Sequence, residues 1–572
     1  MHAGPESTRQ VPADPQKMLK LTKDNTAQLN VVTFASYMTG SSQRLKYHAT
    51  GLFSPLILDY LSDAPSVRPF FQLPPSRSGF EQAIQQRKNF PVNRKALVTH
   101  LQQQYETVAE VDAVSRNINL LLEEHTFTVT TAHQPNLFTG PLYFVYKILH
   151  TIHLAEWLRK EFPGNSFIPV YYMGNEDADF EELSHCTIQG MRYQWKTDQS
   201  GAFGRMVIDK EITRLLQAMS GQLLVQPHGK EIIDALTRSF REKNTIQQAT
   251  FELVHFLFAR FGLVVLIPDS KELKQLMIPA FEQELIHRSS SAAVQQTISE
   301  LEQHYKVQTG GRDINLFYLD EDVRERIEAV GDAYAVANTT IRFTKEELLQ
   351  ELRTHPERFS PNVILRGLYQ ETILPNLAFT GGGGELAYWL ELKNVFSTFG
   401  VPFPVLLLRN SFLLLNGRQE QQARDIGFAV ADFFDSTEAL LNRYVKQNSK
   451  QALSLEEQRQ TLSALYATTG KQATGVDPTL TAHVQALYKQ ADKRLQELEK
   501  KLLRAEKRKF TEQAAQITRI KEELFPNGSF QERKESVIGF YAQYGSGLLD
   551  LLASESLTVE QEFTVLTLHQ SN

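Results

Sequence analysis

The stretch TTAHQPNLFTGPLYFVYKILH, Thr130 to His150, decides the fold because it joins a strand to a helix through a polar turn. Four β-compatible residues, Phe127 to Thr130, lead into the turn, and an apolar helical pattern follows it. Side chains at such a junction point above the sheet, and the first N–H groups of the helix are free to bind an anion. The polar candidates are His133, Gln134, Asn136 and Thr139, with Gly140 in the turn. A purely structural histidine in an ordinary Pro/Gly turn is the alternative.

The chain around this junction alternates short β-rich runs with amphipathic segments from about Val31 to Leu408. The predicted strands are TFTVTTA (126–132), SFIPVYYM (166–173), GLVVLIPD (262–269) and VPFPVLLL (401–408). The pattern predicts an α/β fold with a parallel sheet whose functional groups gather at the carboxyl ends of the strands. Polar, helix-like segments near 205–255 and 285–350 are expected to be insertions.

Composition excludes several classes of partner. The 572 residues are 42% hydrophobic and 22% charged, which is typical of a folded protein, and the net charge of -6 argues against nucleic acid and anionic membrane. The longest apolar run, VPFPVLLLRNSFLLL, contains Arg409 and is shorter than the ~20 residues that span a bilayer. The single cysteine, Cys186, fits a reducing cytoplasm and is read as an inert thiol. The first sixteen residues are expected to be a flexible leader.

An acidic cluster follows the second predicted strand. In PVYYMGNEDADFEEL, the carboxylates are Glu176, Asp177, Asp179, Glu181 and Glu182. Like charges this crowded repel one another unless water, a cation or basic side chains compensate them. Some of them face solvent or cap the next helix; others are candidates to bind an ammonium, a ribose or Mg²⁺.

A run of four glycines, Gly381 to Gly384, lies in the segment SPNVILRGLYQETILPNLAFTGGGGELAYWLELKNVF. One tight turn does not require four glycines, so the chain there is expected to lie against a ligand. A helix is predicted from Glu385, and it carries Tyr388, Trp389 and Lys393. The alternative is a flexible loop followed by a core aromatic pair. Neither Walker A nor the dinucleotide glycine fingerprint is present.

The character of the chain changes after Arg424. Ser454 and Glu457 have capping-box spacing, and one helix of about 47 residues is predicted from Pro478 to Leu524. Its apolar positions recur mostly every three and four residues, which indicates an antiparallel helical hairpin or a dimerising coiled coil. The predicted organisation is a core over 1–424, a helical coiled-coil domain over 425–525, and a segment over 526–572 that returns to the core.

Four motifs together resemble the cysteine-adding enzyme family of bacillithiol biosynthesis: HQPNLFTGPLYFVYKI, NEDADFEEL, LYQETILPNLAFTGGGGELAYWLELK and LFPNGSFQER. The resemblance covers nearly the whole chain. It implies a Rossmann-like core related to class I aminoacyl-tRNA synthetases and nucleotidylyl transferases, with connecting subdomains, a coiled coil and a homodimer. It also implies the joining of the cysteine carboxyl group to the amine of glucosaminyl malate.

The resemblance further implies roles for individual residues. ATP or another nucleotide is the expected cosubstrate; Mg²⁺ is left open, and neither a resident metal nor a redox cofactor is expected. The expected catalytic residues are His133, Gln134, Asn136, Asp177 and Asp179. The expected binding residues are Thr139, Gly140, Glu176, Arg366, Gln370, Gly381, Gly382, Gly383, Gly384, Glu385, Tyr388, Trp389, Lys393 and Arg409. We expect the three polar clusters to line one pocket.

The sequence departs from the family pattern at Ala132, Ala178 and Gly367, where glycine, histidine and proline are usual. A catalytic histidine at 178 is therefore excluded. These departures favour an alternative, a coiled-coil scaffold that has lost activity. The sequence also lacks the lysine signature loop of synthetase-like folds, since RNS, Arg409 to Ser411, is a poor match. A second alternative is a cysteinyl-tRNA synthetase-like enzyme, against which stand the lack of a basic tRNA-binding region and of zinc-spaced cysteines.

Overall fold

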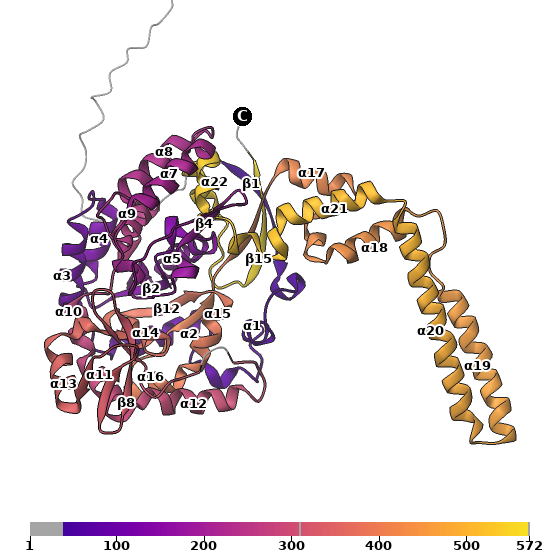
Figure 1. Ribbon diagram of the computed structural model, residues 1–572, viewed down its shortest axis with the longest axis horizontal. Helices are drawn as coiled ribbons and strands as arrows, with labels where there is room; N and C mark the ends of the chain where they lie inside the picture. The colour runs from indigo at the N-terminus through magenta and orange to yellow at the C-terminus, as the bar shows by residue number, and fades with distance from the viewer. Residues whose placement is uncertain (1–37, 308–309, 570–572) are drawn as a thin grey trace, which may run out of the picture. The chain divides into compact units, whose positions relative to one another are not determined.

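The core of the fold is a five-stranded parallel sheet. A computed structural model describes residues 38–307 and 310–569 (Figure 1), so the predicted leader lies outside the described residues. The sheet has the order β13 (Val405–Leu408), β12 (Asn376–Gly381), β2 (Thr126–His133), β3 (Ser166–Met173) and β6 (Val264–Leu266). Every adjacent pair is parallel. If the five strands are numbered by their order along the chain and read from the β6 edge, the order is 3-2-1-4-5. The strand order therefore reverses between β2 and β12.

Both faces of the sheet are buried, as a parallel sheet requires. In β13, Val405 and Leu407 belong to one hydrophobic cluster, and Leu406 and Leu408 belong to the other. Helix α5 (Tyr143–Glu161) packs on β2 and β3, and α2 (Arg77–Lys88) packs on β12 and β13. The predicted α/β class is confirmed.

The four predicted strands are all present, but β12 was not predicted. Its residues, Asn376–Gly381, were assigned to the glycine-rich cluster. The strand is a short apolar run between Pro375 and three further glycines, so its length and flanks resemble a loop. Its position beside β2 brings the glycine run to the centre of the sheet edge.

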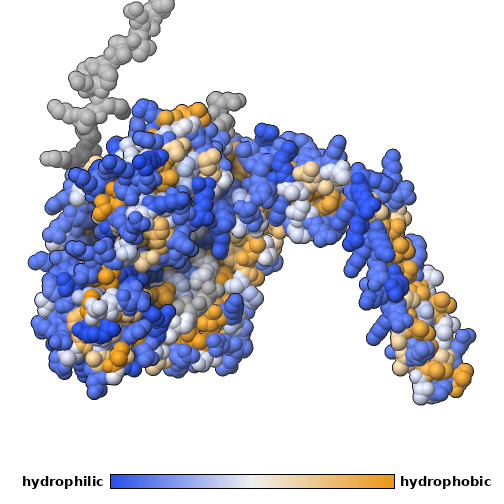
Figure 2. All heavy atoms as spheres, in the orientation of Figure 1, coloured by the Kyte–Doolittle hydropathy of each residue, from blue (hydrophilic) through white to orange (hydrophobic). Residues whose placement is uncertain are grey.

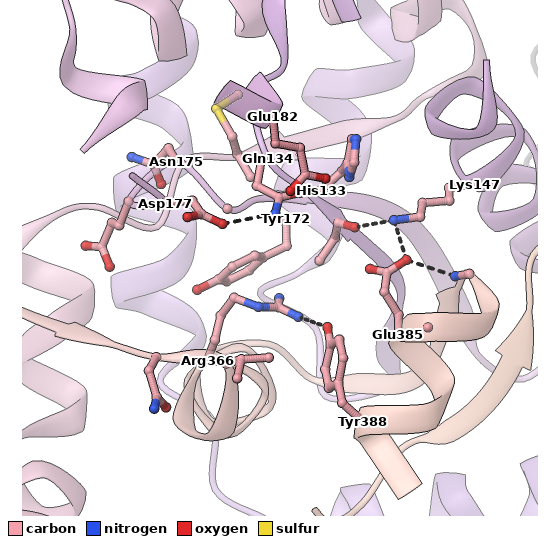
Figure 3. Close-up of a pocket in the computed structure, with 18 of the residues that line it drawn as sticks. His133, Gln134, Lys147, Tyr172, Asn175, Asp177, Glu182, Arg366, Glu385 and Tyr388 are labelled. Carbon is pink, nitrogen blue, oxygen red and sulfur yellow. Dashed lines mark hydrogen bonds and ion pairs between the residues drawn. The ribbon is translucent and has the colours of Figure 1, made fainter. Parts of the chain in front are cut away.

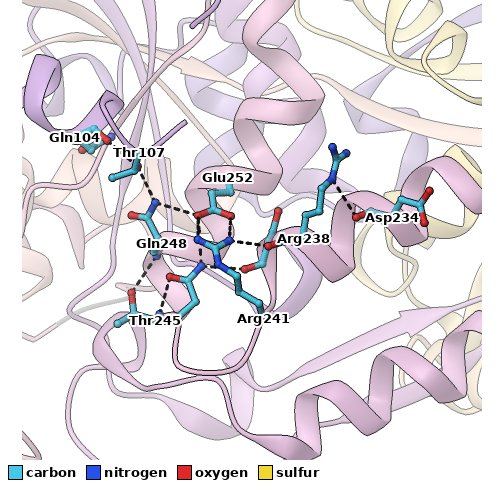
Figure 4. A network of polar contacts seen from close by, with 10 residues as sticks. Gln104, Thr107, Asp234, Arg238, Arg241, Thr245, Gln248 and Glu252 are labelled. Atoms are coloured by element: carbon cyan, nitrogen blue, oxygen red, sulfur yellow. Dashed lines mark hydrogen bonds and ion pairs between the residues drawn. The ribbon is translucent and has the colours of Figure 1, made fainter. Parts of the chain in front are cut away.

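The first predicted insertion is helical, and the second is helical only in part. Residues 205–255 form α7 (Lys210–Leu223), α8 (Gly229–Ser239) and most of α9 (Ile246–Phe258). The loop between α8 and α9 is fixed by Arg241, which contacts both carboxylate oxygens of Glu252 at 2.6 and 2.9 Å (Figure 4).

The helix-like reading of 285–350 is wrong for its second half. After α11 (Ile278–His287) and α12 (Ser289–Leu301), the chain forms an antiparallel sheet. Its order is β10 (Arg342–Thr344), β9 (Ala333–Val336), β8 (Arg324–Val330), β7 (Leu316–Leu319) and β11 (Phe359–Pro361), and α13 (Lys345–Thr354) follows β10. Of the seven residues of β8 only Ile327 is buried, so this strand lacks the apolar signal of a core strand.

A third sheet joins segments far apart in sequence. It has the order β1 (Thr39–Lys46), β15 (Glu562–His569) and β14 (Ser411–Asn416), with β15 antiparallel to β1 and parallel to β14. Helices α22 (Val537–Tyr544) and α23 (Gly547–Ser554) pack on α8 and α5 respectively. The last described residues therefore pack against the α/β core.

The long helix predicted from Pro478 to Leu524 is two helices, α20 (Leu480–Lys507) and α21 (Thr511–Leu524), with a break at 508–510. Helix α20 pairs with the preceding helix, α19 (Glu456–Val476). Three apolar residues of α21 are buried in the main core: Ile517, Ile520 and Leu524. The apolar stripe becomes irregular before Phe510 because α21 packs on the core and not on α19. The predicted capping box is also absent, because Leu455 is the N-cap of α19.

The α19–α20 hairpin leaves apolar side chains uncovered, and Figure 2 shows hydrophobic residues along it. The exposed fractions are 61% for Leu465, 40% for Leu487 and 45% for Leu498. No helix among the described residues is long and apolar enough to cross a bilayer.

Candidate functional site

A cavity of about 580 Å³ opens at the carboxyl ends of β2, β3 and β12. This is the point where the strand order reverses, the usual ligand site of an open α/β sheet. Its polar lining residues are His133, Gln134, Tyr143, Lys147, Tyr172, Asn175, Glu176, Asp177, Glu182, Arg324, Asn362, Arg366, Glu385, Tyr388, Arg409 and Arg533, together with the backbone of Gly382 to Gly384. Members of all three predicted clusters therefore line one pocket (Figure 3).

His133 ends β2 at the back of this pocket. Its side chain lies against the rings of Tyr143 and Phe144, with centroid distances of 5.3 and 5.2 Å. Burial, followed by the nearby positive charges of Lys147 and Arg409, holds the pKa of His133 well below its usual value. The imidazole is therefore neutral, and no described residue is hydrogen-bonded to its Nε2.

Lys147 joins the two halves of the sheet at the reversal point. Its ammonium donates to the carbonyl of Ala132 at 3.1 Å and forms an ion pair with Glu385 (Figure 3). Glu385 in turn accepts a hydrogen bond from the N–H of Gly382 at 2.8 Å. Burial lowers the pKa of Lys147, and Glu385 opposes that shift. These contacts hold the end of β2 against the start of α15 (Gly383–Glu391).

The acidic cluster is partly compensated by basic side chains. Glu176 forms an ion pair with the buried Lys274. Asp177 accepts a hydrogen bond from Gln134 Nε2 at 3.0 Å. Partial burial and the neighbouring carboxylates of Asp179 and Asp177 raise the pKa of Glu182. Asp177 and Glu182 therefore present negative charge to the pocket.

Four arginines supply positive charge. Arg409 is held by both oxygens of the buried Glu532 at 3.0 and 2.8 Å. Arg366 donates to Tyr388 Oη at 2.7 Å, and its Nη1 is buried with no hydrogen-bond partner among the described residues. Arg324, Arg366 and Arg533 form no ion pair with any carboxylate in the described part of the chain. The pocket thus has cations available for an anionic ligand.

Beyond Gln134, the turn after His133 does not enter the pocket, contrary to prediction. Asn136 and Thr139 are each 3% exposed and do not line the cavity. Gly140 has a φ of +62°, and a Cβ there would lie 2.7 Å from the Cβ of Asn136. The turn therefore requires glycine at position 140, because a side chain there would clash with Asn136.

Asp179 and Gln370 are structural as well. Asp179 accepts a hydrogen bond from the N–H of Glu182 at 3.1 Å and so caps α6 (Phe180–Leu183). Gln370 is fully buried and donates to Glu371 at 2.9 Å. Neither residue lines the cavity.

Three predicted residues of the glycine-rich cluster also lie outside the pocket lining. Trp389 is buried 4.6 Å from the ring of Phe379. Lys393 donates to the carbonyl of Pro69. A Cβ at Gly381 would lie 2.6 Å from Phe379, so this glycine is required by packing.

Several lining residues were not predicted, notably Lys147, Tyr172, Arg324 and Arg533. Lys147 had a usable signal, because it is the only Lys, Arg, Asp or Glu in the apolar helical run YFVYKILHTIHL. Arg324 had none, since it lies on a strand with a polar pattern.

The departures from the family pattern leave the polar lining in place. Ala132 supplies the carbonyl that Lys147 binds, and the N–H of Ala178 donates to Asp177 at 2.7 Å. Gly367 packs directly on Trp389, because a Cβ there would lie 3.0 Å from that ring.

Cys186 does not line the pocket. It is buried in β4 (His185–Ile188), and burial raises the pKa of its thiol to about 12. A thiol in this state is protonated and unreactive at neutral pH. Among the described residues, no group of three or more His, Cys, Asp or Glu side chains is placed to hold a metal ion.

The fold and the site define a class: a Rossmann-like protein with a charged small-ligand pocket at the topological reversal point. Two family models match the chain, the N-terminal Rossmann-like domain of bacillithiol biosynthesis BshC over residues 41–410 and the C-terminal coiled-coil domain over 412–568. The chain belongs to the BshC family of bacillithiol biosynthesis.

Relatives support the same assignment. A protein of Flavobacterium johnsoniae named "Putative cysteine ligase BshC" is 38% identical over 92% of this chain and 99% of its own length. Proteins with the same name from Flavobacterium psychrophilum and Salinibacter ruber are 38% and 31% identical, over 91% and 88% of this chain and 98% and 94% of their own lengths. A solved structure titled "putative arginyl t-RNA synthetase" from Campylobacter jejuni covers 76% of this chain and 93% of its own, with 13% identity and a TM-score of 0.19, too low to carry an argument.

Proposed function

We propose that the protein is a ligase that joins the carboxyl group of cysteine to the amine of glucosaminyl malate. The relatives named as cysteine ligases support the reaction class. The observation that carries the proposal is the division of charge in the pocket: carboxylates at Asp177 and Glu182, and arginines without ion pairs at Arg324 and Arg366. One substrate is an amino acid with an ammonium group, and the other carries two carboxylates.

Amide formation in water requires an activated carboxylate, which ATP or another nucleotide would supply. In activation, a carboxylate oxygen of cysteine attacks a phosphorus atom of the nucleotide and forms a C–O–P bond. Pyrophosphate leaves if the product is an adenylate, and the nucleoside diphosphate leaves if it is an acyl phosphate. The neutral Nε2 of His133 would hydrogen-bond to this group as its charge develops. Lys147 would hold the edges of the site at a fixed spacing.

The remaining roles follow from charge. Asp177, fixed by Gln134, would bind the ammonium of cysteine. Arg366, with its free Nη1, would bind a malate carboxylate. The attacking amine must lose a proton, and the raised pKa of Glu182 suits it to accept that proton. The amine then attacks the activated carbonyl carbon, and the C–O bond to the phosphoryl group breaks. The leaving group is the nucleoside monophosphate from an adenylate, or inorganic phosphate from an acyl phosphate.

We place the enzyme in the cytoplasm as a homodimer formed through the α19–α20 hairpin, with no nucleic-acid or membrane partner. The exposed leucines of the hairpin favour self-association. The charged groups retained in the pocket favour an enzyme over an inactive scaffold, because burying them costs free energy that a scaffold does not need to spend.

Mass spectrometry of a reaction with purified protein, cysteine, glucosaminyl malate and each nucleotide in turn tests the proposal. The expected product is the cysteinyl amide, formed only with one class of nucleotide. Product without any nucleotide would exclude the activation step. No product under any condition, with the fold intact, would favour the scaffold.

A further inference from the structure

Three of the four consecutive glycines are not required by the fold. A Cβ at Gly382 would meet only ordinary contacts, 3.5 Å from Glu385 Oε2 and 3.6 Å from Arg409 Nε. A Cβ at Gly383 would lie 3.6 Å from Ile57, and one at Gly384 would meet nothing within 4 Å. None of the three has a positive φ. Alanine would fit at each position, in contrast to Gly381.

Glycine in the first turn of a helix costs stability relative to alanine, because it increases the conformational freedom of the unfolded chain. Gly382 is the N-cap, where glycine is favoured over alanine, but Gly383 and Gly384 lie inside the helix. These two glycines, which neither packing nor φ requires, need another explanation. All three glycines line the pocket. Space for a bound ligand against the backbone supplies that explanation.

The start of α15 also offers unused hydrogen-bond donors. The N-cap is Gly382, which has no side chain with which to cap the helix. No described residue accepts a hydrogen bond from the N–H of Gly383 or Gly384. Such N–H groups at a helix start favour an anionic acceptor.

A buried side chain points to the same place. Arg409 is 5% exposed, its two terminal nitrogens bind Glu532, and its Nε has no hydrogen-bond partner among the described residues. That Nε lies 3.6 Å from the position that a Cβ on Gly382 would occupy. An alanine methyl group at 382 would therefore cover the free donor of Arg409 without displacing it.

We infer that the N-terminus of α15 and Arg409 Nε form an anion subsite that receives a phosphate or carboxylate group of a substrate directly on the Gly382–Gly384 backbone. This inference rests on the proposed function for the identity of the substrates. The hydrogen-bond donors of this subsite are the Nε–H of Arg409 and the backbone N–H groups at the start of α15. The nearby carboxylates are already bound: Glu385 to Lys147 and to the N–H of Gly382, and Glu532 to the terminal nitrogens of Arg409. The subsite therefore selects an acceptor with negative charge.

The test uses Gly382→Ala and Gly384→Ala in the full chain, with Gly221→Ala as the matched control. Gly221 lies in α7, is exposed, and would place its Cβ in open space. Gly384→Ala and the control are expected to keep or raise Tm, and Gly382→Ala, at the N-cap, is expected to lower it slightly. The two pocket variants are expected to raise KM at least tenfold for one substrate, and the control is not.

The substrate whose KM rises identifies the source of the anion: the nucleotide for a phosphate, or glucosaminyl malate for a carboxylate. Unchanged KM values for both substrates in Gly382→Ala and Gly384→Ala would overturn the inference. If the wild-type protein shows no ligase activity, the proposed function fails, and calorimetric titration with pyrophosphate and with malate tests the subsite separately. At least tenfold weaker binding of either probe to Gly382→Ala supports the subsite; equal binding to wild type, or no binding to wild type, overturns it.

Discussion

Two arginine–carboxylate pairs in this protein use the same bidentate chemistry in opposite surroundings. Arg409 and Glu532, beside the pocket, have side chains that are 6% and 1% exposed. Arg459 and Asp492, between α19 and α20, are 28% and 16% exposed. The first pair fixes a side chain whose remaining N–H faces the ligand site, and the second joins two helices whose apolar residues remain uncovered. The pocket region buries charge, and the hairpin exposes apolar surface.

The largest expected effect comes from breaking the buried pair. Arg409→Met leaves the Glu532 carboxylate buried and unpaired, which costs about 3 to 5 kcal/mol of unfolding free energy. Arg459→Met, the matched change in the hairpin, should leave the urea midpoint close to that of the wild type, because solvent screens that pair. Urea unfolding followed by circular dichroism measures both. Equal losses in the two variants would contradict the distinction between the regions.

Lys147→Met should lower kcat/KM by about 100-fold or more, because the edges of β2 and α15 lose their common cation. It also leaves Glu385 without its ion-pair partner. Adding Glu385→Gln is expected to restore part of the stability and none of the activity. Lys160→Met, near the exposed end of the same helix, is the control. Full activity in Lys147→Met would remove Lys147 from the site.

Part of the acid sensitivity of the fold should come from His150, which is buried in α5 outside the pocket lining. Burial lowers the pKa of His150 to about 4, so the unfolded state binds a proton more readily than the folded state. Stability from this residue is fully present above about pH 6.5 and is lost as pH falls from about 6.5 towards 4, by about 2 kcal/mol at pH 5. His150→Gln should flatten the dependence of unfolding free energy on pH over this range. An identical slope in the variant would contradict the assignment.

Replacing exposed leucines of the α19–α20 hairpin by charged residues should dissociate the proposed dimer. The double variant Leu487→Glu and Leu498→Glu is expected to raise the dimer dissociation constant at least tenfold, since a carboxylate in an apolar interface costs more than about 1.4 kcal/mol. Light scattering across a dilution series measures it. A wild-type protein that is monomeric, or a variant that dimerises equally well, would place self-association elsewhere or remove it.

The smallest effect is expected at Cys186. Its protonated, buried thiol does not line the pocket, and in the proposed reaction the thiol of the product comes from cysteine. Cys186→Ser should keep activity within about twofold, at a small cost in stability for the buried hydroxyl. Complete loss of activity with the fold intact would indicate a covalent thioester on this residue.

The sequence predicted the parts of this molecule that carry a strong periodic or local signal. Four strands of the central sheet were correctly placed, because each is an apolar run followed by polar punctuation. Strand β12 was missed because a run of six residues between Pro375 and glycines has no such signal. The strand β8 was missed because the antiparallel sheet to which it belongs buries only Ile327 of its residues.

The position of the pocket was predicted more accurately than the set of residues that line it. Parallel strands bring their carboxyl ends to one edge, so His133, Asp177 and Gly383 were expected to meet. Asn136 and Asp179 were misassigned because a turn residue and a helix cap have the same side-chain types as ligand-binding residues. Arg324 reaches the pocket through the tertiary fold of a separate sheet, which spacing in the sequence does not encode.

The crystal structure of the protein with cysteine, glucosaminyl malate and a non-hydrolysable nucleotide tests the central claim most directly. The account predicts that these ligands lie in the pocket between the ends of β2 and β12. The cysteine ammonium should contact Asp177, a malate carboxylate should contact Arg366, and an anionic group should lie on the backbone of Gly382–Gly384. Ligands bound at another surface, with this pocket holding only solvent, would contradict it.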